Sequence, residues 1–302
     1  MEKQNKIKHK FEFSRYIFPV FTYFICIVWC IIMLTIVIFA ILTAFRKNID
    51  FISNPGGFPK PSALTLDNFK IVFEKTYLYV GRGIGRRKAF MPEIIYNTLF
   101  YSFTNPFFAM VTCACVSYVA CRYRKYKFVK FVYPFTVVLT YLPFGASLAT
   151  TIVFLRKIGI YDNMYLYPLY TCGAFGMDML VYYATWQGFS SEYGDAAAID
   201  GASPMRIFLS VYFPLGKGTF FTLFIMKFII HFQSWEVNLS LLPSYPLIGY
   251  LGYQFQYSQI QEFSRTTVQV AGLLIVSLPV FIIFMAGRKT FMSSLSFGGL
   301  KG

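Results

Sequence analysis

Long runs of apolar residues are the feature that most constrains how this chain can fold. Of its residues, 56% are hydrophobic and only 14% are charged, whereas a soluble domain carries about 25% charged residues. The apolar residues gather in blocks of about 20, the length that an α-helix needs to cross the hydrocarbon core of a bilayer. A membrane β-barrel would instead alternate apolar and polar residues in segments of about 10. The sequence therefore predicts an all-α membrane protein.

Six apolar blocks are long enough to cross a membrane as helices. Their predicted bounds are 16–45, 97–121, 128–155, 163–189, 220–237 and 266–287. The first block is too long for a cleaved signal peptide, and no small-residue cleavage site follows it. Several blocks contain proline, which we interpret as kinks of the kind that membrane helices tolerate. We therefore expect six transmembrane helices.

Basic residues flank the predicted helices and predict their orientation. The formal net charge is +15, and lysines and arginines crowd the N-terminal tail (1–15) and the segment 122–130. Because short cytoplasmic loops are rich in Lys and Arg, we expect both to be cytoplasmic. Helix parity then places residues 190–218 and the C-terminal tail (288–302) on the same side. The predicted extracytoplasmic loop, 46–96, also holds nine basic residues, so this prediction depends on the short loops and on parity.

Neither the cysteines nor the histidines indicate a metal site. All six cysteines lie within or at the ends of apolar blocks, so we expect neither a disulfide framework nor zinc, and we interpret them as small apolar residues. No G-x-x-x-x-G-K-[ST] sequence occurs, so no P-loop is present. The run GRGIGRRK (81–88) is glycine-rich but follows no buried strand, lies on the predicted outer side and has the wrong spacing. We interpret it as a flexible basic loop.

A polar stretch with acidic residues near its start, SSEYGDAAAIDGASPMRIFLSVYFPLGKG (190–218), interrupts the apolar blocks. We call it the acid-fronted stretch. Ser190 or Ser191 can cap a short helix, in whose first turn Glu192 and Asp195 complement the helix dipole. Alanines continue this helix, and the Asp200–Gly201 pair should break it.

A second short helix is predicted after this break. Ser203 is a natural N-cap with Pro204 at the first helical position, and we expect Pro214 to end the helix. Two short helices joined by a sharp bend exceed what a simple connection needs. An amphipathic helix lying on lipid would explain Ile207 and Phe208, but such helices favour Lys and Arg on their polar face. The acidic residues favour a protein partner instead.

Part of the acid-fronted stretch, DAAAIDGASPMRIFLSVYFPL, resembles the cytoplasmic signature of permease subunits of binding-protein-dependent ABC importers. That signature reads Glu-Ala-Ala, three residues, Gly, nine residues, Ile, one residue, Leu-Pro. The matching positions are Asp195, Ala196, Ala197, Gly201, Val211, Phe213 and Pro214. Asp, Val and Phe replace Glu, Ile and Leu at 195, 211 and 213. The sugar-permease form of the signature is matched by Asp200, Gly201, Ala202, Ser203 and Phe208.

The resemblance extends towards both ends of the chain. LTLDNFKIVF (64–73) is similar to the Thr-Leu-x-Asn-Tyr segment of the outer loop in that family, and YNTLFYS (96–102) to the start of its next helix. Trp235 resembles the tryptophan late in span five. The ending FGGLKG (297–302) is similar to the Gly-x-x-Lys-Gly ending of the maltose-type second permease subunit. The resemblance implies the Type I ABC importer permease fold, with a five-helix core over 97–287 and a cytoplasmic coupling-helix loop at 190–218.

The same resemblance implies an oligosaccharide transport subunit of the bacterial plasma membrane, and not an enzyme. It implies a second homologous permease subunit, an ATPase dimer that binds ATP and magnesium, and an extracytoplasmic sugar-binding protein as partners, with no cofactor in this chain. Because the basic residues lie at the ends of the predicted spans, we expect membrane lipid and no nucleic acid beside them. Closure of the ATPases would move the acid-fronted stretch as a lever, switching the helices between inward-open and outward-open states. The residues implied to dock the ATPase are Glu192, Asp195, Ala196, Ala197, Asp200, Gly201, Ala202, Ser203 and Phe208.

Ionisable side chains inside the predicted spans are costly there and usually face a cavity or a partner. Polar and aromatic residues of the fifth span lie at offsets of 4, 7, 8 and 11 from Lys227, which would place them on one helical face. Such a face suits the rings and hydroxyls of a sugar. The predicted pathway residues are Asp178, Lys227, His231, Ser234, Trp235 and Asn238. We expect Asp178 and Lys227 to face the protein interior, where they can pair. The alternative is that these groups hold helices together while the partner permease forms the sugar site.

Two other functions compete with this interpretation. A non-sugar importer of the same superfamily would share the signature. A membrane-embedded sugar transferase should carry clusters of acids or histidines in its loops, whereas the cytoplasmic acids here gather in the acid-fronted stretch.

Overall fold

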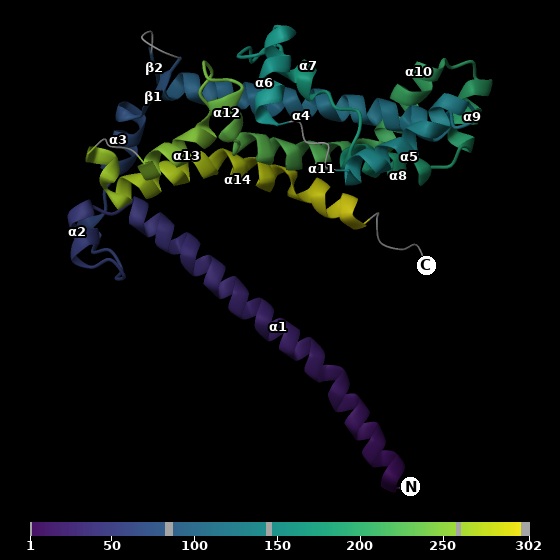
Figure 1. Cartoon of the computed structure of the whole chain (residues 1–302). Coiled ribbons are helices and arrows are strands. Elements are labelled where there is room, and N and C mark those ends of the chain that lie inside the picture. The colour runs from purple at the N-terminus through teal and green to yellow at the C-terminus, as the bar shows by residue number, and fades with distance from the viewer. Residues whose placement is uncertain (1, 82–86, 143–146, 258–260, 297–302) are drawn as a thin grey trace. The chain divides into compact units, whose positions relative to one another are not determined.

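The computed structural model describes residues 2–81, 87–142, 147–257 and 261–296, which are almost entirely helical (Figure 1). The chain divides into two compact units, which are described separately. Unit 1 comprises residues 1–73 and 258–275, and unit 2 comprises residues 74–257 and 276–302. The tail FGGLKG and the middle of the GRGIGRRK run lie outside the described residues.

Unit 1 is built on one long helix and a short folded segment that follows it. Its elements are α1 (Glu2–Ala44), α2 (Asn48–Ser53), a 3-10 turn (Pro61–Ala63), the main part of α3 (Asp67–Lys75), the 3-10 turn Gln261–Ser264 and the start of α14 (Thr266–Ser296). From Phe18 to Phe39, α1 exposes nearly every large apolar side chain. Such a helix is typical of one that faces lipid or another subunit.

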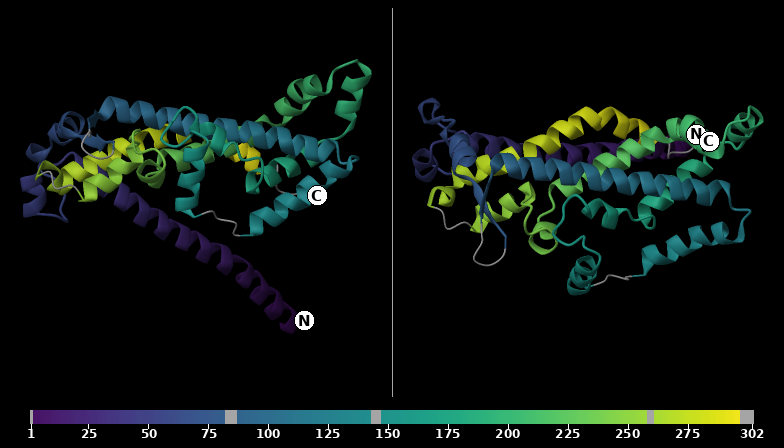
Figure 2. Two further views of the ribbon diagram at one scale, coloured as in Figure 1. Left: turned by 45° about the horizontal axis from the view of Figure 1, so that its top comes forward. Right: turned by 90° about the horizontal axis from the view of Figure 1, so that it is seen from above.

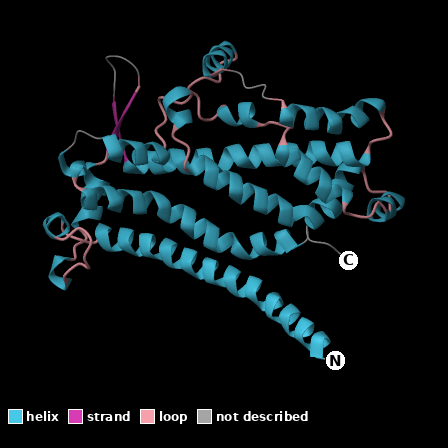
Figure 3. Ribbon diagram, turned by 60° about the horizontal axis from the view of Figure 1, so that its bottom comes forward, coloured by secondary structure: helices cyan, strands magenta, loops and turns pink. Residues whose placement is uncertain are grey.

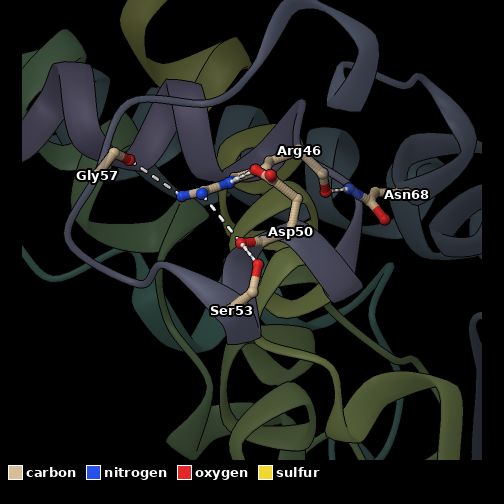
Figure 4. A network of polar contacts seen from close by, with 5 residues as sticks. All are labelled: Arg46, Asp50, Ser53, Gly57 and Asn68. Atoms are coloured by element: carbon tan, nitrogen blue, oxygen red, sulfur yellow. Dashed lines mark hydrogen bonds and ion pairs between the residues drawn. The ribbon is translucent and has the colours of Figure 1, made fainter.

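Arg46 organises the segment that follows α1. This side chain is 2% exposed and forms an ion pair with Asp50 of α2. Its guanidinium also donates to the backbone carbonyl oxygens of Asp50 and Gly57, each at 3.0 Å (Figure 4). A buried charge is stable only when it is paired and hydrogen-bonded. The network therefore folds residues 46–57 back towards the end of α1.

Asn68 of α3 completes this network. Its side-chain Nδ2 donates at 2.8 Å to the carbonyl oxygens of both Ala44 and Arg46, and the residue is 5% exposed. Ala44 is the last residue of α1, and carbonyls at a helix end lack intrahelical partners. Asn68 thus supplies the missing donor, which gives a physical role to the asparagine in the matched segment 64–73.

Unit 2 begins with a β-hairpin and continues as a helical bundle (Figure 3). Strands β1 (Tyr77–Val80) and β2 (Arg87–Phe90) pair antiparallel, with Leu78 opposite Ala89. The later elements are α4 (Met91–Arg122), α5 (Lys127–Tyr141), α6 (Leu148–Lys157), α7 (Tyr167–Thr171), α8 (Met177–Gln187), α9 (Glu192–Ile199), α10 (Pro204–Ile207), the π-helical turn η3 (Phe208–Tyr212), α11 (Phe213–Phe232), α12 (Glu236–Ser240), α13 (Ile248–Tyr257) and the remainder of α14.

The hairpin was not predicted. Its strand β1, which has one buried face, directly precedes the GRGIGRRK run, so our expectation that this run follows no buried strand is wrong. Leu78, Val80 and Ala89 are at most 2% exposed, whereas Tyr79 is 60% exposed. This alternation is typical of a strand with one buried face, and β1 is only four residues long. An alternating pattern over only four residues is hard to distinguish from a loop in the sequence.

Within the described residues, four apolar blocks form continuous helices long enough to cross a membrane: 18–44, 91–122, 204–232 and 266–288. The third and fourth blocks are not single helices. The third divides into α5 and α6, and the fourth into α7 and α8. In the fourth block the break contains Gly176, whose φ of 123° a helix cannot accommodate. Non-helical backbone at membrane depth is tolerated where protein buries it.

The core of unit 2 forms where α4 packs against α8 and α11. Trp186 of α8 is 1% exposed, and its indole Nε1–H donates to Ser117 Oγ of α4 at 2.8 Å. A Cβ atom at Gly216 of α11 would lie 2.4 Å from the Trp186 ring, so only glycine permits this approach. Trp186 therefore joins three helices.

Polar side chains along α4 serve the backbone at the breaks in the neighbouring segments. The Thr98 hydroxyl accepts from Ile248 N–H at 2.7 Å, at the start of α13. Cys113 Sγ donates to Gly173 O at 3.1 Å, between α7 and α8. Arg122 donates to Phe189 O at 2.8 Å, beyond the end of α8. Helix α4 therefore satisfies polar groups that the broken helices leave unpaired.

The Asn68 contact predicts the effect of an isosteric change. Asn68→Asp replaces an amide donor by a carboxylate that faces two carbonyl oxygens, so it should destabilise unit 1 by about 1 to 3 kcal/mol, the cost of an unsatisfied buried polar group. Thermal unfolding and limited proteolysis of segment 45–75 measure this. The matched control is Asn54→Asp, because Asn54 is exposed at the end of α2. Equal stability of both variants would contradict the assigned role.

Candidate functional site

The acid-fronted stretch forms one short helix and the start of a second, joined by the predicted glycine turn. In Figure 1, α9 and α10 lie at one end of α4 and the hairpin lies at the other. Figure 2 shows the two short helices projecting beyond the neighbouring helices of unit 2. Ser190 Oγ accepts from Glu192 N–H at 3.2 Å and helps to start α9. Glu192 and Asp195 occupy its first turn and are exposed.

Gly201 makes the turn between the two helices. Its φ is +80°, in the left-handed region that favours glycine. Gly201 N–H donates to Ala198 O and Ala202 N–H donates to Ala197 O, each at 3.0 Å. This pair of bonds is the Schellman arrangement that closes a helix C-terminus. The predicted bend at Gly201 is therefore confirmed, and it has a defined geometry.

Ser203 begins the second helix as predicted. Its Oγ accepts from Arg206 N–H at 3.4 Å, and Pro204 occupies the first turn. The helix does not end at Pro214, so that prediction is wrong. It continues as α10, η3 and α11 to Phe232. In the π turn, Phe213 N–H bonds to Phe208 O, five residues back. Such a wider turn is one way a helix continues past the carbonyl that a proline displaces.

The predicted docking residues divide into an exposed and a buried group. Glu192, Asp195, Ala196, Asp200, Gly201 and Ser203 are exposed, whereas Ala197 and Ala202 are partly buried against the core. Phe208 is 6% exposed, with its ring 4.8 Å from that of Tyr118. The prediction that Phe208 lies on the docking surface is therefore wrong, because it supports the stretch from inside. Two apolar side chains that we had not predicted are exposed instead, Ile199 at 87% and Met205 at 64%.

Asp178 and Lys227 form an ion pair between two helices. Lys227 Nζ of α11 lies 2.8 Å from Asp178 Oδ2 of α8, and the side chains are 36% and 23% exposed. Asp178 is in the first turn of α8, where the helix dipole also favours a carboxylate. The expected pairing of these two side chains is confirmed.

The other predicted pathway residues do not form one helical face. Helix α11 ends at Phe232, so Ser234 and Trp235 lie in the following connection and position 238 lies in α12. The sequence interpretation had extended the fifth span to 237. A Cβ atom at Gly249 of α13 would lie 2.6 Å from Gln233 O, so α13 packs closely against this chain turn.

His231 remains on the helix with Lys227. Its Nδ1 lies 3.0 Å from Lys227 O, and its ring is 5.4 Å from that of Tyr101 in α4. Of the predicted pathway residues, the structure therefore brings together the Asp178–Lys227 ion pair and His231, one helical turn from Lys227. Among the described residues, no three His, Cys, Asp or Glu side chains are placed to hold a metal ion.

Comparisons with known proteins match most of the chain. The family model described as "Binding-protein-dependent transport system inner membrane component" matches residues 99–290. The maltodextrin transport system permease protein MdxG of Bacillus subtilis (strain 168) is 27% identical over 242 residues, covering 79% of this chain and 81% of that protein. The probable starch degradation products transport system permease protein AmyC of Thermoanaerobacterium thermosulfurigenes is 23% identical over 265 residues, covering 86% and 89%.

A solved structure has a similar fold. It is the crystal structure of a bacterial ABC transporter involved in the import of the acidic polysaccharide alginate. One of its chains superposes with a TM-score of 0.74 at 19% identity, over 92% of this chain and 98% of that one.

The ion pair predicts a compensating double mutant. Asp178→Asn or Lys227→Met alone leaves one charge unpaired between α8 and α11, and each should lower the unfolding free energy by about 1 to 3 kcal/mol. The double variant removes both charges and should be more stable than either single variant. A double-mutant cycle on thermal stability in detergent measures the coupling. Additive effects of the two substitutions would show that the pair is not formed.

Proposed function

Because this chain belongs to the family of binding-protein-dependent transport system inner membrane components, we propose that it is a permease subunit of an ATP-driven importer of oligosaccharides. It is a multi-pass membrane protein with the predicted Type I ABC importer permease fold. It is a transport subunit and not itself an enzyme.

The observation that carries the proposal is the exposed helix α9 with its glycine turn. Helix α10 continues directly into α11, so a force applied to α9 and α10 reaches a helix long enough to span a membrane. The exposed Glu192 and Asp195 suit charge-assisted hydrogen bonds to basic or amide groups. Ile199 and Met205 add apolar area for burial. This is a surface that an ATPase subunit can bind and move.

The substrate class is proposed from the relatives. Two permease proteins that match most of this chain are named for maltodextrin and for starch degradation products. We propose that this subunit serves the uptake of an oligosaccharide, delivered by an extracytoplasmic binding protein. A second, homologous permease would complete the pathway, with the Asp178–Lys227 pair facing it or bordering it.

The proposed orientation places the acid-fronted stretch and both termini in the cytoplasm. Residues 46–96, with the hairpin and the Arg46 network, would then be extracytoplasmic, and the segment 97–287 would form the five-span core with the coupling loop. An ATPase that uses cytoplasmic ATP can dock only on the cytoplasmic side. Capture of the ATPase through α9 therefore tests the orientation as well as the docking.

Alternating access would follow from movement of this docking surface. Closure of the ATPase dimer on ATP displaces α9 and α10, and the long helices to which they are joined tilt with them. ATP and magnesium would be bound by the ATPase partners. The role of the present chain is to convert their closure into opening of the pathway on the other side of the membrane.

Gly201 offers the sharpest test of the docking surface. Gly201→Leu forces a side chain onto a left-handed residue and adds bulk where the ATPase would bind, so ATPase co-purification and maltotriose uptake should each fall at least about tenfold, the loss of about 1.4 kcal/mol. Membrane insertion should be unchanged.

Gly159→Leu is the matched control. Gly159 also has a positive φ, +75°, and no described atom lies within 4 Å of where its Cβ would be, as at Gly201. It lies in the turn after α6, away from the acid-fronted stretch. If the Gly201→Leu protein retains the ATPase and normal uptake, the acid-fronted stretch only connects two helices and does not dock the ATPase.

A further inference from the structure

Arg122, the last residue of α4, reaches across to the end of α8. Its Nη2 donates to the carbonyl oxygens of Phe189 at 2.8 Å and Trp186 at 3.2 Å, and lies 3.5 Å from that of Ser190. Carbonyls at a helix C-terminus lack intrahelical partners and carry the negative end of the helix dipole. A guanidinium satisfies both requirements, so it holds the end of α8 and the residues that lead into α9 against the end of α4.

The same guanidinium stacks on Tyr212. Arg122 Cζ lies 4.4 Å from the ring centroid of Tyr212, which is 2% exposed in the π turn η3. The Tyr212 hydroxyl also donates to Ser190 O at 3.4 Å. Only a planar, delocalised cation can lie on a ring and offer several donors at its edge. Arg122 thereby connects α4 both to α8 and to the turn that leads into α11.

Tyr212 in turn contacts helix α9. A Cβ atom at Gly194, in the middle of α9, would lie 2.7 Å from the Tyr212 oxygen and 3.1 Å from a ring carbon. The backbone of α9 therefore rests on the Tyr212 ring with no room for a side chain between them. Gly194, Tyr212 and Arg122 form one continuous stack from α9 to α4.

The surroundings of Arg122 distinguish it from the other basic residues nearby. It is partly buried, whereas Arg124, two positions further, is exposed. The Arg122 Nε–H is buried without a hydrogen-bond partner among the described residues. The carbonyls and the ring therefore determine how the guanidinium is oriented. Replacing the Arg122 guanidinium would therefore release both the end of α8 and the residues that lead into α9.

We propose that Arg122 is a positioning residue that makes α9 and α4 move as one body when the ATPases close. The inference rests on the proposed function in one respect, that an ATPase binds α9. It adds that the motion reaches α4 through the Gly194–Tyr212–Arg122 stack, in parallel with the direct connection of α10 to α11. Helix α4 contacts α5, α7, α8, α11 and α13, so α4 can distribute the motion through unit 2.

The test measures the distance between α9 and α4 in the assembled importer. Spin labels replace Tyr193 of α9 and Phe108 of α4, which are 55% and 47% exposed, in a cysteine-free background. The full complex in nanodiscs is measured without nucleotide and after trapping with ATP and vanadate. With Arg122 present, the distance distribution should be the same in both states. In Arg122→Gln and Arg122→Lys, it should broaden and shift on trapping, and maltotriose transport per ATP hydrolysed should fall about tenfold, the value of one charge-assisted hydrogen bond.

Arg124→Gln is the matched control and should behave as the unmodified protein in both measurements. If Arg122→Gln does not accumulate in the membrane, Tyr212→Leu removes the other half of the stack, and Tyr212→Phe, which keeps the ring, should rescue the coupling. A distance that shifts on trapping with Arg122 in place, or Arg122→Gln and Tyr212→Leu complexes that match the unmodified one, would overturn the proposal. A complex that does not transport maltotriose but shows the expected spin-label distances in the unmodified protein and the Arg122 variants would refute the proposed substrate. The positioning role of Arg122 would still stand.

Discussion

The polar side chains spaced along α4 are the constraint on which the rest of unit 2 depends. A backbone inside a bilayer has to satisfy its hydrogen bonds without water, and this bundle contains several interrupted helices. Thr98, Asn105, Cys113, Ser117 and Arg122 follow one another along α4, and each contacts a residue in or beside a neighbouring break or helix end. Asn105 Oδ1, for example, accepts from the hydroxyl of Thr171 at the end of α7. One continuous helix thus stabilises several discontinuous ones.

This arrangement bears directly on how a permease can move. Interrupted helices held by side chains can shift at their breaks, because a side-chain contact exchanges more easily than a continuous backbone ladder. The two ends of α4 serve different elements. Thr98 binds the start of α13 at one end, and Arg122 binds the end of α8 at the other. The Asp178–Lys227 pair joins α8 to α11 between them. A displacement that begins at α9 is therefore transmitted through a small number of specific contacts between α4, α8, α11 and α13.

Sequence reasoning recovered the features that local chemistry determines. The N-cap at Ser203, the bend at Gly201 and the pairing of Asp178 with Lys227 were all predicted, because capping, left-handed φ and the cost of a charge in lipid are local or nearly local effects. The failures arose where tertiary contacts decide. Helix α11 ends at Phe232, and Gly249 of α13 packs against the backbone of Gln233 and Ser234 just beyond it. Phe208 is buried by Tyr118 and Trp186. Thr98, Asn105 and Ser117 of α4 are fully buried, and their contacts with neighbouring elements were not predicted.

The central claim is that α9 receives the ATPase, and site-specific photo-crosslinking in intact cells tests it most directly. A photoreactive amino acid at Ile199, which is 87% exposed on α9, should capture the ATPase subunit. The same amino acid at Tyr79, 60% exposed on the hairpin at the other end of unit 2, should not. Capture of the ATPase from position 199 alone is the predicted result. Crosslinks from position 199 to lipid only, or capture of the ATPase from position 79, would contradict the account.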